Sequence, residues 1–226
     1  MTRVHCYVTI FTVMTMPICH IIGAGDFFAE NLYPRVDGDL IIAADGGLKR
    51  LSEIGISPDF AIGDFDSCPT PEPDSRFQII RLEPEKDDTD MLCSIRFGCG
   101  KGFRVFHIHG GTGGRPDHTF ANIQCLAYLA KKSASGFLFF QNFVMTAISD
   151  CEMQIEGNPG DYISVFAYGG KASGVTLSGL KYPLSDAVLS DDYPLGVSNE
   201  FTAQPARISV ACGMLLISCP VNAKIY

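Results

Sequence analysis

Short apolar runs alternate with amphipathic segments from Pro17 to about Ser149, and this alternation limits the folds open to the chain. The apolar runs have the length and residue content of buried strands and lie at residues 18–22, 39–44, 60–62, 77–80, 104–108 and 136–140. Helical spacing between them lies at residues 48–54, 90–97 and 118–132. Strands that alternate with helices predict an α/β domain with a Rossmann-like, mostly parallel sheet covered on both faces.

The sequence changes character after about Asp150, where short apolar runs are separated by Gly, Pro, Asn and Asp. No helical periodicity follows, so this part predicts a small antiparallel β domain. We therefore expect one domain over residues 17–150 and a second over residues 151–226. Residues 1–16 are moderately apolar but have no recognisable export cleavage site, and we interpret them as an extension ahead of a true start at Met14 or Met16.

Composition excludes several classes of function. The formal net charge of −8 argues against a nucleic-acid partner, because no basic stripe is present to neutralise phosphates. No apolar run approaches the ~20 residues needed to span a bilayer, so we expect no membrane association. The nine cysteines are scattered without a C-x-x-C pair, which favours thiols in a reducing cytoplasm over a disulfide framework or a zinc ribbon.

Two acidic clusters follow predicted strands. Asp64 and Asp66 in Gly63-Asp-Phe-Asp-Ser67 would share one face if the strand ran through them. The second cluster is Lys86-Asp-Asp-Thr-Asp90, in which Thr89 is a good N-cap. Alone, the first cluster could be a solvated turn and the second an exposed helix start. Together they predict a Mg²⁺ site for phosphate chemistry, with Asp64, Asp66 and Asp90 as ligands, because like charges held close need a hard cation.

The strongest local signal for anion binding is Gly110-Gly-Thr-Gly-Gly-Arg-Pro-Asp-His118. Four of its first five residues are glycine, which frees the backbone to wrap an anion, and the helix that follows aims its unpaired amides at the same place. Arg115 can bind phosphate through two parallel hydrogen bonds. A flexible loop would not need Arg115, and the segment is not a Walker A loop because no Gly-Lys-Ser/Thr follows.

Two glycine turns and a histidine pair are weaker signals. Gly23-Ala-Gly25 and Asp45-Gly-Gly47 could each bring backbone amides to an anion, although strand-to-helix turns often need glycine only for geometry. His107 and His109 alternate on a predicted strand and could bind a metal together. Because the sequence offers no clear third ligand, we interpret them as residues that pack or position a loop.

Taken in order, these segments resemble the thiamine pyrophosphokinase family. The motifs that carry the resemblance are Ala44-Asp-Gly-Gly47, Gly63-Asp-Phe-Asp-Ser67, Lys86-Asp-Asp-Thr-Asp90, Gly110-Gly-Thr-Gly-Gly-Arg-Pro-Asp-His118, Ser178-Gly-Leu-Lys-Tyr-Pro-Leu184 and Gly196-Val-Ser-Asn-Glu-Phe201. The resemblance spans roughly residues 17 to 220. It implies an N-terminal domain that binds ATP and Mg²⁺, a C-terminal β-sandwich, and a homodimer. Thiamine would lie where the N-terminal domain of one subunit meets the C-terminal domain of the other.

The resemblance also assigns roles by position. The catalytic and metal carboxylates it implies are Asp64, Asp66 and Asp90, with Asp87 close by. The residues at the nucleotide are Asp45, Gly46, Gly47, Gly110, Gly111, Arg115, Asp117 and His118. Ser198 and Asn199 match the pair that contacts the aminopyrimidine of thiamine. Eukaryotic members stack a tryptophan on the substrate, and this chain has none, so Tyr182 or Phe201 would take that place.

The expected reaction is attack of the thiamine hydroxyethyl oxygen on the β-phosphorus of ATP, which releases AMP. Asp90 or Asp87 would accept the hydroxyl proton. Two other functions stay open from the sequence. The chain could be a different Mg²⁺-dependent phosphotransferase or hydrolase on the same scaffold, or a non-catalytic nucleotide-binding module.

Overall fold

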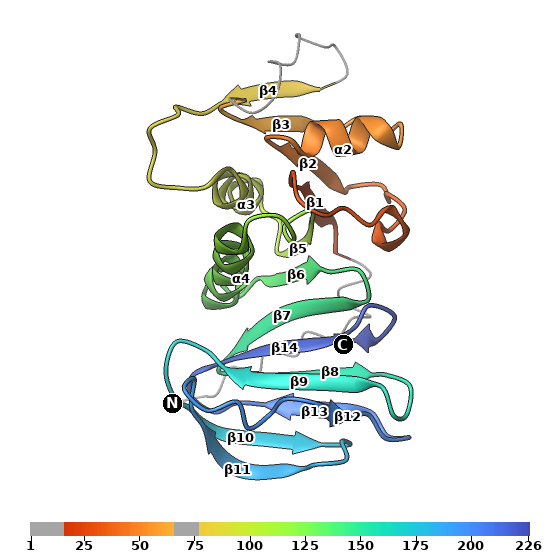
Figure 1. Ribbon diagram of the computed structural model, residues 1–226, viewed down its shortest axis with the longest axis vertical. Helices are drawn as coiled ribbons and strands as arrows, with labels where there is room; N and C mark the ends of the chain where they lie inside the picture. The colour runs from red at the N-terminus through yellow and green to blue at the C-terminus, as the bar shows by residue number, and fades with distance from the viewer. Residues whose placement is uncertain (1–15, 66–76) are drawn as a thin grey trace. The chain divides into compact units, whose positions relative to one another are not determined.

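The computed structural model describes residues 16–65 and 77–226, and within them the chain forms two compact units (Figure 1). The N-terminal unit comprises Pro17–Leu126 with Gly136–Gln141. The C-terminal unit comprises Ala127–Ser135 with Asn142–Tyr226. The C-terminal unit begins ahead of the boundary expected near residue 150. One reason is that β7 (Phe143–Ser149) pairs with β14 (Met214–Pro220), a strand of this unit.

The N-terminal unit is built on a sheet in the order β6-β5-β1-β2-β3-β4. Its strands are β1 (Ile18–Ile22), β2 (Leu40–Ala44), β3 (Phe60–Gly63), β4 (Gln78–Arg81), β5 (Val105–His109) and β6 (Ser135–Phe139). The four pairings from β5 to β4 are all parallel. Every residue of β2 and of β5 is buried, as expected for central strands of a sheet covered on both faces. The predicted strands are confirmed, with ends that shift by one residue at most.

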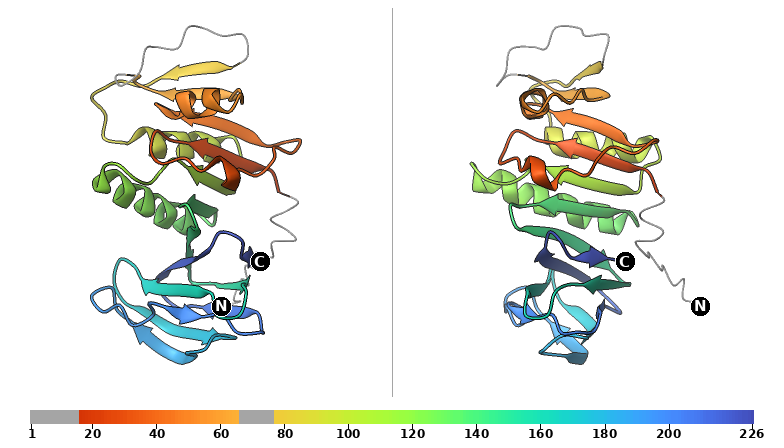
Figure 2. Two further views of the ribbon diagram at one scale, coloured as in Figure 1. Left: turned by 45° about the vertical axis from the view of Figure 1, so that its right-hand side comes forward. Right: turned by 90° about the vertical axis from the view of Figure 1, so that its right-hand side faces the viewer.

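Helices cover both faces of this sheet, as predicted (Figure 2). Leu51 of α2 (Gly47–Glu53) packs on one face with Ile22 and Ile41. On the other face α3 (Asp90–Gly100) approaches so closely that a Cβ on Gly98 would lie 2.7 Å from the Phe106 ring. The Thr89 hydroxyl accepts a hydrogen bond from the Leu92 amide at 3.2 Å, which confirms it as the N-cap of α3. The third helix, α4, spans Pro116–Lys131.

The turn at Gly23 does not lead directly into a helix. The amides of Gly25 and Asp26 donate to the carbonyls of Gly110 and Thr112 at 2.8 and 2.7 Å. These amides are therefore used to hold two loops together. The chain then runs over the sheet through a single 3-10 turn, η1 (Ala29–Asn31), before it enters β2.

The C-terminal unit consists of two antiparallel sheets, as predicted. The remaining strands are β8 (Glu152–Glu156), β9 (Tyr162–Ala167), β10 (Ala172–Ser178), β11 (Leu184–Leu189), β12 (Asn199–Glu200), β13 (Ala206–Ser209), β14 (Met214–Pro220) and β15 (Lys224–Ile225). Four of its strands lie side by side in the order β12-β9-β14-β7, and five form a sheet in the order β11-β10-β13-β8-β15. Burial alternates along β9 and β13, so each sheet turns one face to a core, which is the pattern of a β-sandwich. Among the described residues, no helix combines the length and apolar character that a membrane span requires.

Candidate active site

The polar residues predicted from sequence gather where the parallel strands end. Gly23 follows β1, Asp45 follows β2, Asp64 follows β3 and Gly110 follows β5. Because these strands run parallel, their carboxyl ends meet at one edge of the sheet. Ligands of open α/β sheets bind at this edge, which makes it the candidate active site.

Three carboxylates form a cluster there. Asp45, Asp64 and Asp90 each offer an oxygen, and these oxygens lie within 4.8 Å of one another. Asp45 is held in a left-handed backbone conformation, with φ of 46°, by a hydrogen bond of 2.9 Å from its amide to the Ile62 carbonyl. A Cβ at position 63 would lie only 3.0 Å from the Asp45 Cα, so this close approach of the two strand ends favours glycine at position 63. Three convergent carboxylate oxygens are a hard donor set that fits Mg²⁺.

Lys86 lies between two of these carboxylates, and the sequence interpretation gave it no role. Its ammonium is 3.1 Å from Oδ2 of Asp64 and 3.0 Å from Oδ1 of Asp90. Burial lowers the pKa of Lys86, but hydrogen bonds and charges from Asp90 and Asp64 outweigh this effect and raise it overall. Lys86 therefore stays charged and offsets the repulsion between the carboxylates. The available signal was its spacing of four residues from Asp90 near a helix start.

The cluster differs from the predicted metal set in its members. Asp45, expected on the phosphate side, lies with the carboxylates, and Asp66 falls outside the described residues. Asp87 is exposed and is not a member of the cluster. The argument from strand alternation does not hold for Asp64, because β3 ends at Gly63 and Phe65 turns away with φ of 55°. Phe65 is 5% exposed and anchors this turn in the core.

The Gly110 loop and the Gly23 turn pack directly against each other beside the acidic cluster. A Cβ on Gly23 would lie 2.6 Å from the Gly110 carbonyl oxygen and 3.1 Å from Cε of Met91. Gly110 itself has φ of 62°, a conformation that favours glycine. Met91 follows Asp90 directly, so the start of α3 packs on the turn that carries the loop. The side chain of Asn122 on α4 donates to the Gly111 carbonyl at 2.7 Å and fixes the other side of the loop.

Arg115 and Asp117 pair with each other at the start of α4. The guanidinium donates through Nη2 to Oδ2 at 2.6 Å and through Nε to Oδ1 at 3.2 Å. The Arg115 guanidinium lowers the pKa of Asp117, and Asp117 raises that of Arg115. Both side chains are exposed, so water and salt screen the pair and a phosphate could replace Asp117 on the guanidinium. Pro116 is the first residue of α4, a position where its missing amide hydrogen costs the helix no hydrogen bond.

The predicted thiamine residues of the C-terminal unit also lie together. The buried Asn199 side chain accepts from the Tyr182 amide at 3.0 Å and donates to the Tyr182 carbonyl at 2.8 Å. Asn199 therefore holds the segment that carries the Tyr182 ring, which is 57% exposed. Ser198 directly precedes Asn199 in the chain and has a left-handed backbone conformation, with φ of 56°. Phe201 is only 2% exposed, so of the two aromatic candidates only Tyr182 presents a ring to a ligand.

The fold and the site together define a class of enzyme. A parallel α/β sheet with three carboxylates beside a glycine loop and an arginine at its carboxyl edge is typical of enzymes that act on metal-bound phosphates. The antiparallel C-terminal unit with an exposed tyrosine provides a second candidate binding surface.

Comparison with known proteins gives the particular family. The catalytic domain of thiamin pyrophosphokinase matches residues 36–138, and the vitamin B1 binding domain of thiamin pyrophosphokinase matches residues 150–215. The thiamine pyrophosphokinase of Bacillus subtilis (strain 168) is 31% identical over 201 residues, which cover 83% of this chain and 92% of that protein. The chain belongs to the thiamine pyrophosphokinase family.

Solved structures agree with this assignment. The thiamine pyrophosphokinase of Bacillus subtilis superposes with a TM-score of 0.77 at 26% identity, over 91% of this chain and 99% of that chain. The enzyme from Geobacillus thermodenitrificans gives the same score and identity over 90% and 97%. Thiamin pyrophosphokinase from Candida albicans shares the fold at 16% identity, with a TM-score of 0.71 over 94% and 91%. The matches give no support to a different phosphotransferase or to a non-catalytic module.

Proposed function

We propose that this chain transfers the pyrophosphoryl group of ATP to the hydroxyethyl oxygen of thiamine, which gives thiamine diphosphate and AMP, through the carboxylate cluster at the carboxyl edge of its parallel sheet. The observation that carries the proposal is the convergence of Asp45, Asp64 and Asp90 beside the Gly110 loop. The family membership of both parts of the chain supports thiamine as the acceptor.

Asp45, Asp64 and Asp90 would hold Mg²⁺, together with Asp66 as the sequence predicts. When bound there, Mg²⁺ would neutralise charge on the phosphates and make the phosphorus more electrophilic. Lys86 holds Asp64 and Asp90 in place through its two ion pairs and adds a positive charge beside the polyphosphate.

The triphosphate would lie along the glycine turns. Backbone amides of the Gly110 loop and of the first turn of α4 would donate to phosphate oxygens. Arg115 would exchange its exposed partner Asp117 for a phosphate and stabilise charge that develops during transfer. An open hollow that includes Pro116 and Phe120 lies beside this loop and offers an apolar surface to the adenine ring.

The thiamine hydroxyl oxygen attacks the β-phosphorus, the bond from that phosphorus to the α-phosphate oxygen breaks, and AMP leaves. A carboxylate must accept the hydroxyl proton. We assign this role to Asp90 over Asp87, because Asp90 lies in the cluster and Asp87 is exposed outside it. Tyr182 would stack on thiamine, with Ser198 beside it and Asn199 positioning the tyrosine.

Thiamine would lie between subunits of a homodimer, where the N-terminal unit of one meets the C-terminal unit of the other, so the dimer is the active species. Light scattering at concentrations that span the activity assay tests this, and a fully active monomer would contradict it.

The enzyme would work in the cytoplasm, an environment compatible with the buried thiols of Cys19 and Cys219.

The decisive experiment separates the products of ATP by chromatography, with and without thiamine. We expect AMP to form only when both thiamine and Mg²⁺ are present. The Asp64→Asn variant should lose this AMP formation. The matched control is Asp37→Asn, an exposed aspartate ahead of β2 at the opposite edge of the sheet, which should behave as wild type. Formation of ADP or phosphate independently of thiamine, or no turnover at all, would overturn the proposal.

A further inference from the structure

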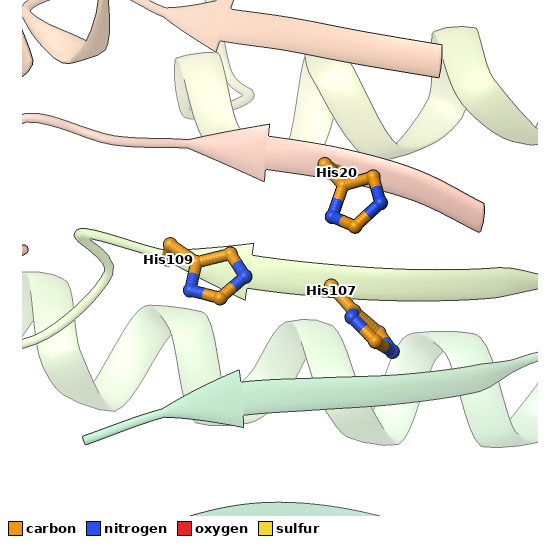
Figure 3. A group of neighbouring side chains, drawn as sticks. All are labelled: His20, His107 and His109. Atoms are coloured by element: carbon orange, nitrogen blue, oxygen red, sulfur yellow. The ribbon is translucent and has the colours of Figure 1, made fainter. Parts of the chain in front are cut away.

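Three buried histidines meet on the sheet face that lies opposite α3 (Figure 3). His20 comes from β1, and His107 and His109 come from β5. His20 and His107 are direct partners in the parallel register, and His109 is two residues further along its strand, so all three side chains share one face. Each offers a ring nitrogen, and these nitrogens lie within 4.8 Å of one another.

The ring nitrogens have few partners, although the side chains are almost fully buried. The exposed fractions are 1% for His20, 8% for His107 and 1% for His109. Among the described residues, no hydrogen-bond partner lies within 3.5 Å of either nitrogen of His20, of Nδ1 of His107 or of Nε2 of His109, although the Asp39 carboxylate is 3.6 Å from Nε2 of His20. Buried polar atoms are normally satisfied, because leaving them unpaired is costly. Such a concentration of unpaired nitrogens points to a ligand.

Aromatic packing accounts for the ring faces but not for these nitrogens. The His109 ring stacks on Phe139 with centroids 4.3 Å apart and an interplanar angle of 11°. The His107 ring lies 5.2 Å from Phe139 and 5.3 Å from Tyr33. These contacts hold the rings in place, while none of them gives a ring nitrogen a hydrogen-bond partner.

The electrostatic surroundings suit metal ligation. Burial lowers the pKa of all three histidines, that of His109 to about 3, so each ring is neutral at pH 7 and keeps a lone pair. Asp39 lies 3.6 Å from Nε2 of His20 and is itself fixed by the Ile18 and Val36 amides at 2.7 and 2.8 Å. A carboxylate beside a histidine is the usual outer partner of a metal ligand and would offset part of the ion's charge.

We propose that His20, His107 and His109 bind a transition-metal ion such as Zn²⁺ at a site separate from the carboxylate cluster. Imidazole nitrogens select zinc, copper, nickel or iron, whereas Mg²⁺ prefers oxygen. A tetrahedral ion with bonds of 2.0–2.1 Å needs its ligand nitrogens about 3.3 Å apart, so binding would draw the three rings closer together.

The position of the site indicates a structural role. His109 precedes Gly110, and its carbonyl accepts a hydrogen bond of 2.8 Å from the Gly23 amide. A metal ion would tie β1 to β5 directly beneath the two glycine turns. It would therefore stiffen the loop that we assign to phosphate, without taking part in transfer.

The test uses the full chain, stripped with a chelator and titrated with Co²⁺ and then Zn²⁺. Cobalt in a tetrahedral nitrogen site absorbs visible light far more strongly than cobalt in an octahedral oxygen site, so the spectrum separates the histidines from the carboxylates. We expect one strongly absorbing Co²⁺ per chain, displaced by Zn²⁺, and a melting temperature that rises with Zn²⁺. Asp64→Asn should leave the spectrum unchanged, which keeps this result independent of the proposed transferase activity.

The matched variants are His107→Phe and His118→Gln. Phenylalanine fits among the aromatic neighbours of His107, so the His107→Phe variant should keep its core. We expect this variant to bind Co²⁺ and Zn²⁺ at least tenfold more weakly and to show no shift in melting temperature with Zn²⁺. His118 is exposed at the start of α4, so its loss should leave the spectrum intact. A wild-type protein without the strong Co²⁺ spectrum, or a spectrum that survives in a folded His107→Phe variant, would overturn the proposal and leave an aromatic packing cluster.

Discussion

The Lys86 ammonium lies 3.0 Å from the Asp90 carboxylate, four residues further along the chain. The same ammonium is 3.1 Å from Asp64, so one positive charge separates two acidic groups whose mutual repulsion would otherwise open the site. This contact links the loop before α3 to the turn after β3 and makes Lys86 a positioning residue for the carboxylates.

Replacing Lys86 with methionine removes both ion pairs but keeps most of the apolar stem. Asp64 and Asp90 should then separate, and kcat/KM should fall about 10- to 100-fold, the usual cost of losing a group that orients metal ligands. The measurement is thiamine-dependent AMP formation across a Mg²⁺ titration, in which the variant should need more Mg²⁺. Lys171→Met, at an exposed position of the C-terminal unit, is the control. An unchanged Mg²⁺ dependence would show that Lys86 does not position the carboxylates.

Asp66 is predicted as a metal ligand from its motif alone, since it lies outside the described residues. Asp66→Asn keeps the size of the side chain and removes its charge, so thiamine-dependent AMP formation should fall by roughly 100-fold or more. The same assay on Asp37→Asn sets the baseline for an exposed aspartate. Activity within about threefold of wild type would remove Asp66 from the metal set.

The close approach of Gly110 to Gly23 can be separated from ordinary backbone strain. Gly55 and Gly110 both have positive φ, 71° and 62°, but a Cβ on Gly55 meets nothing within 4 Å, whereas one on Gly110 would overlap the Gly23 carbonyl. Gly55→Ala should therefore lower the free energy of unfolding by about 1–2 kcal/mol, the cost of the left-handed conformation. Gly110→Ala should lower it further and weaken ATP binding.

Urea unfolding and ATP titration of the two alanine variants check this prediction. Equal losses of stability, with ATP affinity intact in both, would show that the two glycine turns need not touch.

Tyr182 and Asn199 should affect thiamine and leave ATP alone. Tyr182→Ala should raise the KM for thiamine about 2- to 10-fold, because a stacked ring contributes about 0.5–1.5 kcal/mol, while Tyr182→Phe should stay near wild type. Asn199→Ala removes the two hydrogen bonds that hold Tyr182 and should also lower the free energy of unfolding by about 1–3 kcal/mol. Separate KM values for thiamine and ATP are the readout, and an equal rise in both would contradict the assignment.

A buried thiol provides a test of stability against pH. Burial raises the pKa of Cys219 to about 12, whereas an unfolded thiol ionises near pH 9. Above pH 9 the unfolded chain loses this proton and the folded chain keeps it, so rising pH favours unfolding until about pH 12. Cys219→Ala should flatten the decline in the free energy of unfolding over this range. An equally steep decline in the variant would mean that other groups cause it.

Local sequence determined much of this protein. The run that became β2 is apolar for its whole length, which requires burial on both faces whatever its neighbours are. Thr89 specifies the start of α3 through its own side chain. The glycines from Gly110 to Gly114 predict a loop suited to an anion because the conformations they permit belong to the residues themselves. These properties act over a few residues, so they can be read along the chain.

The composition of each side-chain cluster was decided only by the tertiary structure. Asp45 joins Asp64 and Asp90, and Lys86 lies beside the last two, because β2 and β3 are neighbours and α3 begins above them. The tertiary structure of the C-terminal unit likewise decides that Phe201 is buried and Tyr182 exposed. From the sequence, His107 and His109 could be recognised only as two histidines that alternate along one predicted strand. The third histidine, His20, is 87 residues from His107 and becomes its direct partner because β5 lies beside β1. Strand order depends on contacts between distant segments, and no local pattern encodes it.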